Sequence, residues 1–413
     1  MTGYRSAEAR VFGVATLVSL VHAIDDAFVH RGPGLGLGQH ALAGAISIAA
    51  ALGGIAAFPS LRPGLRSALA LAFGGLACVN GVLHLVHVGG DGPADGDVTG
   101  VLALAAGAVL VGLAAFIPWH HRGERATSAP RRWLRRALVA IAGFAAVLFV
   151  LGPVSLGIIE THKWREPIGP PPSPAYRDVT FRASDGLELA GWYRPSHNGA
   201  AVLVVHGGGG DRTGAVAHAE MLARHGYGVL VYDARGRGES DGSPNGFGWD
   251  WRKDVAGALA LLRRQPDVDP HRIGAVGLST GADVLIEVAA QRGDLAAVVA
   301  DGAAAESFED WHRLRGNDLG LPSGWVMFTT IRVLTGDPPA PALEDLVARI
   351  EAPTLLISAG KAEERDFNVL YDKVGNPAVE HWNLPDAHHT DAIREHPREY
   401  ERRVVTFLDK ELT

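Results

Sequence analysis

The chain has 413 residues, of which 47% are apolar and 20% are charged, and its formal net charge is −7. The length favours more than one domain, the charge balance gives no sign of nucleic-acid binding, and a single cysteine, Cys78, excludes an intrachain disulfide. Apolar residues dominate the chain before residue 160, and most of the charge follows it. We therefore expect a helical membrane region at 1–160 and a different kind of domain after it.

Five apolar segments are each close to the ~20 residues that a helix needs to cross a bilayer. They lie at about 10–30, 38–59, 65–88, 98–118 and 134–159. Arginines precede the first segment, lie between the second and third (Arg62 and Arg66), and gather between the fourth and fifth. Since basic loops stay on the cytoplasmic side, the pattern predicts an integral protein of the plasma membrane whose C-terminal half is extracytoplasmic.

Polar residues inside these segments need a reason, because charged groups are costly in hydrocarbon. His22, Asp26 and His30 recur every four residues and share one helical face, and His84 and His87 lie in the third segment. They could form a small metal or proton-handling site. Hydrogen bonding between helices is the interpretation that we prefer.

A proline-rich linker at 161–175 separates the two halves, because its run of prolines cannot continue a helix. From 176 to 413, short apolar runs alternate with helical patterns. The runs predict strands at 179–182, 187–193, 201–205, 229–232, 273–276, 297–300, 354–357 and 379–382, and helices at 213–225, 251–264, 280–292 and 400–412. This alternation predicts an α/β fold with a mostly parallel sheet, helices on both faces, and chemistry at the carboxyl ends of the strands.

The pattern Gly-x-Ser-x-Gly occurs twice, around Ser240 and around Ser279. A nucleophilic serine of this type needs a strand directly before it and a helix directly after it. Ser279 has both, whereas Ser240 is followed by the loop sequence Asp-Gly-Ser-Pro-Asn-Gly. We expect Ser279 to be the nucleophile.

A serine hydroxyl needs a base, which is usually histidine. His388 and His389 follow the last predicted strand, and adjacent side chains point in different directions, so only one can face Ser279. The acid that orients the histidine should follow the strand at 354–357. Glu363 is our first choice there, with Glu364 and then Asp366 as alternatives.

Acyl transfer also needs N–H donors for the developing oxyanion. Four glycines follow the strand at 201–205, and Gly208 is the expected donor from this loop. The N–H of Thr280, directly after the nucleophile, is the expected second donor. The glycine run lacks the Gly-Lys-Ser/Thr ending of a phosphate loop.

The second half resembles the α/β-hydrolase superfamily, and within it the Bem46-like and serine-aminopeptidase-like hydrolases. The resemblance rests on five segments: 185–193, His206-Gly-Gly, Asp233-Ala-Arg-Gly-Arg-Gly-Glu-Ser240, Gly277-Leu-Ser-Thr-Gly281 and Asp386-Ala-His-His-Thr390. In those families the last motif looks like Gly-Ala-Gly-His-Thr, which aligns His389 with the catalytic histidine. The resemblance also implies that the arginines of 233–240 are architectural, and it leads us to expect an aspartate where this chain has Glu363 and Glu364.

A segment at about 305–350, rich in apolar residues such as Trp311 and Trp325, lies where related enzymes carry a cap. An apolar cap and a membrane anchor favour a small acyl substrate of lipid-like character, although these residues could equally pack the cap onto the sheet. We expect hydrolysis of a carboxylic ester or thioester without a metal or organic cofactor. A peptidase or amidase with the same triad, and a non-catalytic receptor or scaffold, are the alternatives.

Overall fold

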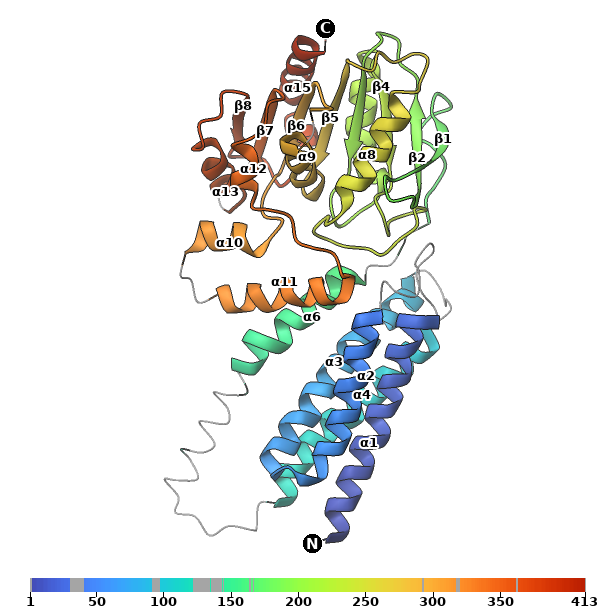
Figure 1. The fold of residues 1–413 in the computed structure, drawn as a ribbon, viewed down its shortest axis with the longest axis vertical. Coiled ribbons are helices and arrows are strands. Elements are labelled where there is room, and N and C mark those ends of the chain that lie inside the picture. Colours follow the sequence, from blue (N-terminus) through green and yellow to red (C-terminus); the bar gives the residue numbers. More distant parts are fainter. Residues whose placement is uncertain are drawn as a thin grey trace. The chain divides into compact units, whose positions relative to one another are not determined.

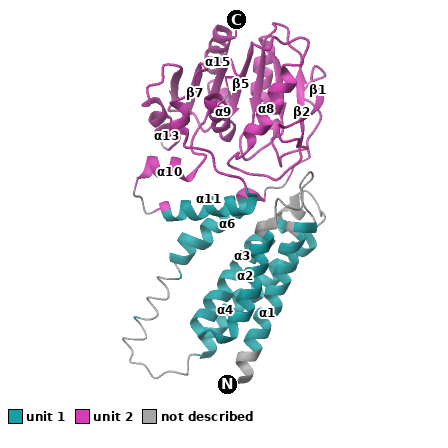
Figure 2. Ribbon diagram, viewed as in Figure 1, with its two compact units in different colours: residues 1–31, 35–159, 322–336 teal, residues 32–34, 160–321, 337–413 magenta. Residues whose placement is uncertain are grey.

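The computed structural model describes residues 2–29, 41–90, 97–121, 134, 143, 145–162, 165, 167–291, 293–316, 320–361 and 363–412. Its contacts divide the chain into two compact units (Figure 2). The helical unit comprises residues 1–31, 35–159 and 322–336, and the hydrolase unit comprises 32–34, 160–321 and 337–413.

The hydrolase unit is built on one eight-stranded sheet (Figure 1). Its strands are β1 (Arg177–Arg182), β2 (Glu188–Arg194), β3 (Ala201–Val205), β4 (Gly228–Tyr232), β5 (Ile273–Leu278), β6 (Ala297–Asp301), β7 (Thr354–Ala359) and β8 (Val379–Leu384). They are ordered β1-β2-β4-β3-β5-β6-β7-β8. The pairs β1–β2 and β2–β4 are antiparallel, and the pairs from β4 to β8 are parallel. The predicted strands are all present, and the architecture is that of an α/β-hydrolase.

Helices cover both faces of this sheet, as predicted. One apolar core packs the sheet against α8 (Trp251–Leu262), α9 (Thr280–Gln291), α12 (Leu343–Val347) and α13 (Glu363–Asp372). The other packs it against α7 (Val216–Arg224) and α15 (Pro397–Glu411). The all-buried strand β3 shows why such runs read as continuous apolar sequence: alternate residues of Ala-Val-Leu-Val-Val point into the two cores.

The helical unit contains the apolar segments of the first half. Its elements are α1 (Thr2–Ile24), η1 (Asp25–Val29), α2 (Ala41–Ala57), η2 (Phe58–Ser60), α3 (Pro63–Gly90), α4 (Asp97–His120), η4 (Val147–Leu151) and α6 (Gly152–Thr161). Among the described residues, α1, α3 and α4 are long and apolar enough to cross a membrane. The second predicted segment forms the shorter α2. Part of the fifth, at 135–142 and 144, lies outside the described residues, and its C-terminal part forms η4 and α6.

A chain of hydrogen bonds links the polar residues of three helices inside this unit. Thr99 donates to Asp25 (2.6 Å between oxygens), so its hydroxyl accepts from Nδ1 of His22 (3.0 Å). Nε2 of His22 then accepts from the amide of Asn80 (3.0 Å). The geometry accounts for buried His22 by interhelical hydrogen bonding, the interpretation that the sequence analysis preferred.

His84 makes a second polar link, from α3 to α4, by donating from Nδ1 to Asp97 (2.9 Å). Its ring has room because the neighbouring residue on α4 is Gly100, where a Cβ would lie 2.2 Å from the ring. Within the described residues no three histidine, cysteine or acidic side chains are arranged to hold a metal. His30 lies outside the described residues, as do the side chains of Asp26 and His87.

Arg66, which the sequence analysis places in a basic loop, is buried inside the helical unit. Arg66 lies in the first turn of α3, fully buried, and pairs with the buried Glu8 of α1 (2.5 Å). A second bond to Glu8 comes from His121 (3.1 Å). Arg66 therefore joins two helices of the unit instead of marking a loop.

Candidate active site

Ser279 occupies a strained turn between the end of β5 at Leu278 and the start of α9 at Thr280. Its φ is +53°, which is unusual for a residue with a side chain. The flanking glycines make the turn possible: a Cβ at Gly277 would lie 2.3 Å from the carbonyl oxygen of Gly281, and one at Gly281 would lie 2.4 Å from that of Val205. The turn is the nucleophile elbow that the sequence predicts at Ser279.

His389 reaches Ser279 from the loop after β8. Its Nε2 lies 2.8 Å from Oγ of Ser279, and its Nδ1 lies 2.6 Å from Oε2 of Glu364. Because a carboxylate only accepts hydrogen bonds, Nδ1 carries the proton and Nε2 accepts from the serine hydroxyl. Gly302, with φ of +78°, allows this approach, since a Cβ there would lie 2.9 Å from Cε1 of His389.

The acid that contacts His389 is Glu364. Our first choice from the sequence, Glu363, is therefore wrong, and the alternative Glu364 holds this position. Glu363 and Glu364 are the first two residues of α13, and consecutive helical side chains point about 100° apart. Glu363 turns to Arg315, which donates to it (2.6 Å). The other oxygen of Glu364 accepts from the backbone N–H of Ala359 at the end of β7 (2.6 Å), and Asp366 pairs with Arg365.

The hydrogen bond to Glu364 raises the pKa of His389 above its usual value. Two further carboxyl groups lie close enough to affect His389 electrostatically, Asp283 on α9 and Asp301 at the end of β6. Burial raises the pKa of Asp283 to about 8 and that of Asp301 to about 7. Glu364 is thus the carboxylate that directly contacts His389, and Asp283 is mostly protonated at neutral pH.

Gly208 and Thr280, the expected oxyanion donors, lie together beside the serine. A Cβ at Gly208 would lie 2.5 Å from Oγ1 of Thr280 and 2.0 Å from the carbonyl oxygen of Gly246, so this position accepts only glycine. Thr280 itself donates to Gly246 (3.0 Å).

Two residues that the sequence analysis did not single out hold this glycine loop. Arg237 donates to the carbonyl oxygen of Gly208. His206 donates from Nδ1 to the carbonyl oxygen of Gly207 (2.7 Å) and accepts from the N–H of Ala234 (3.0 Å). Burial lowers the pKa of His206 to about 4, so it bonds as a neutral ring. Both residues stand inside the motifs that carried the resemblance, at His206-Gly-Gly and at 233–240.

Ser240, from the second Gly-x-Ser-x-Gly match, and His388, the neighbour of His389, make other contacts. Ser240 is fully buried, donates to the carbonyl oxygen of Asp233 (2.6 Å) and accepts from the N–H of Ala190 (2.9 Å). His388 is exposed and bonds Glu395 (2.5 Å). Neither residue contacts Ser279 or His389 through these bonds, in agreement with the choice of Ser279 and His389.

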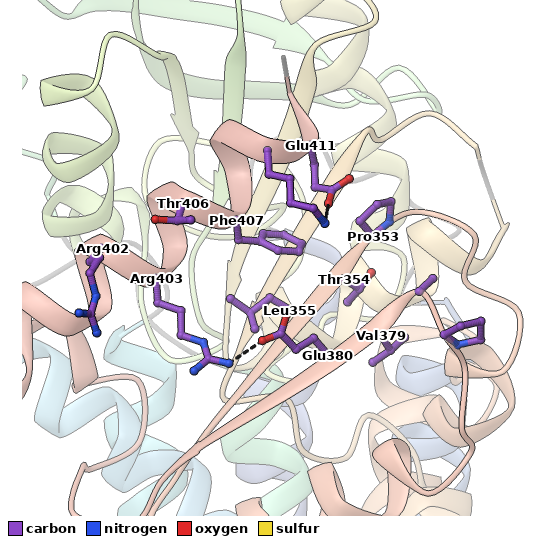
Figure 3. A pocket seen from close by; sticks show the side chains of 13 residues that line it. Pro353, Thr354, Leu355, Val379, Glu380, Arg402, Arg403, Thr406, Phe407 and Glu411 are labelled. Carbon is purple, nitrogen blue, oxygen red and sulfur yellow. Dashed lines mark hydrogen bonds and ion pairs between the residues drawn. The ribbon is translucent and has the colours of Figure 1, made fainter.

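A pocket of about 730 Å³ lies elsewhere on the hydrolase unit (Figure 3). It is lined by the first residues of β7 and β8 and by α15, including Thr354, Val379 and Phe407. Two ion pairs, Arg403 with Glu380 and Lys410 with Glu411, cross its wall. The pocket lies at the amino ends of β7 and β8, whereas Ser279 and His389 follow the carboxyl ends of strands. It therefore does not contain the candidate active site.

Comparison with known families finds one match over the second half of the chain. The model of the X-Pro dipeptidyl-peptidase (S15 family) matches residues 173–384, just over half of the chain. The match includes Ser279 and Glu364, and His389 lies five residues beyond it.

Several curated proteins align with parts of the chain. An uncharacterised protein of Mycobacterium tuberculosis (strain ATCC 25618 / H37Rv) is 41% identical over 139 residues, 32% of this chain and 49% of that protein. YfhR of Escherichia coli (strain K12) is 28% identical over 253 residues, 58% and 82% of the two chains. The thiohydrolase aneE of Aspergillus aculeatus is 35% identical over 118 residues, 28% and 37%. The chain thus spans about half the length of the M. tuberculosis protein.

Solved structures align with the second half. The Pyrococcus furiosus esterase Pf2001 matches with a TM-score of 0.49 and 25% identity, covering 61% of this chain and 100% of that chain. An acylaminoacyl peptidase of Pyrococcus horikoshii matches with a TM-score of 0.41 and 20% identity, covering 57% and 41%.

Proposed function

The chain belongs to the X-Pro dipeptidyl-peptidase (S15) family, and on that premise we propose that it is a serine hydrolase which cleaves a carboxylic ester or thioester through an acyl-enzyme on Ser279. The observation that carries the proposal is the continuous contact from Glu364 to His389 to Ser279, at 2.6 and 2.8 Å. Such a relay activates a serine hydroxyl, and a purely structural serine has no use for it.

In the proposed reaction, Oγ of Ser279 attacks the carbonyl carbon while its proton passes to Nε2 of His389. Glu364 stabilises the imidazolium ion that forms, and the N–H groups of Gly208 and Thr280 bind the oxyanion. His389 then gives the proton to the departing alcohol or thiol as the acyl-enzyme forms. Water, deprotonated by His389, attacks the acyl-enzyme and releases the acid and free Ser279. These side chains and water supply every step.

A peptidase or amidase is the second candidate, favoured by the family match, whose description names a dipeptidyl-peptidase. The triad geometry serves both reactions, so substrates must separate them. We would compare 4-nitrophenyl esters of increasing chain length with an X-Pro 4-nitroanilide. Faster turnover of the esters supports the main proposal, and faster release of 4-nitroaniline supports the alternative.

We further propose that the substrate is a small acyl compound with lipid-like character. The membrane-capable helices that precede the domain support this choice, because they would bring such substrates within reach. The arginine pattern further leads us to propose that the hydrolase domain faces the extracytoplasmic side of the plasma membrane. Labelling of an introduced surface cysteine in intact cells by a membrane-impermeant maleimide tests this orientation, with lysed cells as the control.

The first experiment is labelling by a fluorophosphonate probe in membranes. Wild type should label, Ser279→Ala should not, and His389→Ala should label far more slowly. Turnover of an ester by Ser279→Ala should fall by about 10⁶-fold, as when a triad serine is removed. A folded wild type that takes up no probe would contradict the enzyme proposal and favour the receptor or scaffold alternative.

A further inference from the structure

An apolar helix, α11 (Leu321–Thr335), is inserted between β6 and β7 of the hydrolase sheet. Only Arg332 among its 15 residues is charged. Residues 322–336 group by their contacts with the helical unit and not with the hydrolase unit (Figure 2). The segment in which the sequence predicts a cap therefore contains a helix whose neighbours are apolar helices.

The partner of α11 is the segment formed by η4 and α6. Gly157 of α6 allows close packing, because a Cβ there would lie 2.8 Å from Cβ of Thr330 and 3.1 Å from the carbonyl oxygen of Met327. A hydrogen bond from Ser323 to the carbonyl oxygen of Leu148 (3.1 Å) joins the two at another point. Small residues at the contact and a hydroxyl bonding across it are the means by which helices associate in membranes.

Three further hydroxyl groups of this helix pair donate to backbone carbonyl oxygens of their own helix. Ser155 donates to the carbonyl oxygen of Leu151 (2.7 Å), Thr330 to that of Val326 (2.8 Å), and Thr335 to that of Ile331 (3.0 Å). Each bond runs back four residues along the same helix. Such bonding removes the cost of placing a hydroxyl in an apolar environment.

The outward side of the pair is apolar. Leu148, Val150, Leu156 and Trp325 are each about half exposed, at 49, 48, 52 and 56%. We propose that these four residues, the α6–α11 surface, bind a phospholipid bilayer, with Trp325 at the boundary of hydrocarbon and headgroups. Tryptophan is enriched at that depth. Both helices belong to the same compact unit as the membrane-capable helices, and this membership favours lipid over a protein partner.

The test measures where the surface lies in a bilayer and needs no substrate, so its outcome is independent of the proposed reaction. The full chain carrying Cys78→Ala is reconstituted into phosphatidylcholine–phosphatidylglycerol vesicles with one nitroxide-labelled cysteine. The labelled positions are Trp325→Cys and, as a second position, Leu148→Cys. Val109→Cys on α4 serves as the lipid-exposed control and Arg182→Cys on β1 as the aqueous control. Circular dichroism checks that each protein is folded.

Accessibility to oxygen, which concentrates in lipid, is compared with accessibility to a water-soluble nickel chelate. We expect positions 325 and 148 to follow Val109, with oxygen accessibility several-fold higher than nickel accessibility. Values like those at Arg182 would show that the surface faces water. Low accessibility to both reagents would show that protein covers it. Either of these two results overturns the proposal.

Discussion

The two units differ in where they place large apolar side chains. In the described part of the chain, every large apolar residue that is exposed belongs to the helical unit, from Val11 to Trp325. The hydrolase unit, by contrast, buries such residues in the two cores beside its sheet. The helical unit thus has an apolar surface, and the hydrolase unit has an apolar interior. The exposed apolar residues of the helical unit are what we expect of helices surrounded by lipid, in which apolar contact costs nothing.

Buried polar groups differ in the same way. In the hydrolase unit they position the glycine loop, the elbow and His389, and so serve a reaction. In the helical unit they join helices to one another, as Arg66 does with Glu8 and His84 with Asp97. If this comparison holds, changes to the first group should alter rate, and changes to the second should alter stability.

After the loss of Ser279 itself, the largest effect is expected at Glu364. Glu364→Gln should lower kcat for an ester by roughly 10²–10⁴-fold, because an amide cannot stabilise the imidazolium ion of His389. The hydrogen bond to Glu364 raises the pKa of His389, and the neutral ring is the active form. Loss of the carboxylate therefore lowers that pKa and moves the acidic limb of kcat/KM to lower pH.

A pH series of kcat/KM measures this shift, with Glu363→Gln as the matched control. Glu363 contacts Arg315 instead of His389, so its amide variant should keep the wild-type profile. Equal losses in the two variants, or a limb displaced to higher pH, would remove Glu364 from its assigned position in the triad.

A buried ion pair of the helical unit should show the opposite behaviour. Arg66→Met removes the arginine that pairs with the buried carboxylate of Glu8 and leaves its bond to His121, and this should destabilise the unit by roughly 3–5 kcal/mol. Turnover of a soluble ester at 25 °C should be retained. Thermal unfolding in detergent, followed by circular dichroism, measures the loss. Restoration of much of the stability by Glu8→Gln in the same chain would show that an unpaired charge caused it.

Close packing of α3 on α4 should give a smaller effect. Gly100→Ala places a Cβ 2.2 Å from the ring of His84, and the required shift should cost about 1–3 kcal/mol. Gly112 lies on the same helix with nothing within 4 Å of its would-be Cβ, so Gly112→Ala should be neutral or slightly stabilising. The two unfolding midpoints in detergent are compared directly. Equal midpoints would mean that α3 and α4 do not pack as described.

The smallest effect is expected on the water-facing surface of the hydrolase unit. Arg182 pairs with Glu188 at 3.6 Å, and both side chains are more than half exposed. Water screens such a pair, so Arg182→Ala should change the free energy of unfolding by no more than about 0.5 kcal/mol. Chemical denaturation measures it. A larger loss would mean that this surface is covered in the protein.

The sequence predicts Ser279 and the sheet because both depend on short-range patterns. An apolar β-branched run predicts β3 and β5, and two glycines around one serine at a strand–helix boundary predict the elbow. His389 needed the resemblance as well, since two adjacent histidines cannot be told apart by pattern alone. These predictions concern residues whose environment lies within a few positions along the chain.

The acid and α11 depend on distant parts of the chain, and for that reason the sequence does not determine them. Whether Glu363 or Glu364 faces His389 depends on the rotation of α13 about its axis. Arg315, 48 residues before Glu363, binds Glu363, and the N–H of Ala359 binds Glu364. Similarly, the apolar composition of α11 fits a cap and a membrane-packed helix equally well. Its contact with Gly157 and the bond from Ser323 to Leu148 separate the two.

The grouping of α11 with the helical unit also determines how the two units could be separated by cutting the chain. From residue 159 onward, the chain passes between them at 159–160, at 321–322 and at 336–337. A protease that cuts the proline-rich linker severs the first connection alone, and the released sheet would still hold an apolar helix between β6 and β7. Separation without denaturation therefore requires removal of α11 as well, for example by replacing 320–337 with a short Gly-Ser segment. The hydrolase unit is thus joined to the helical unit on both sides of α11 as well as through the linker.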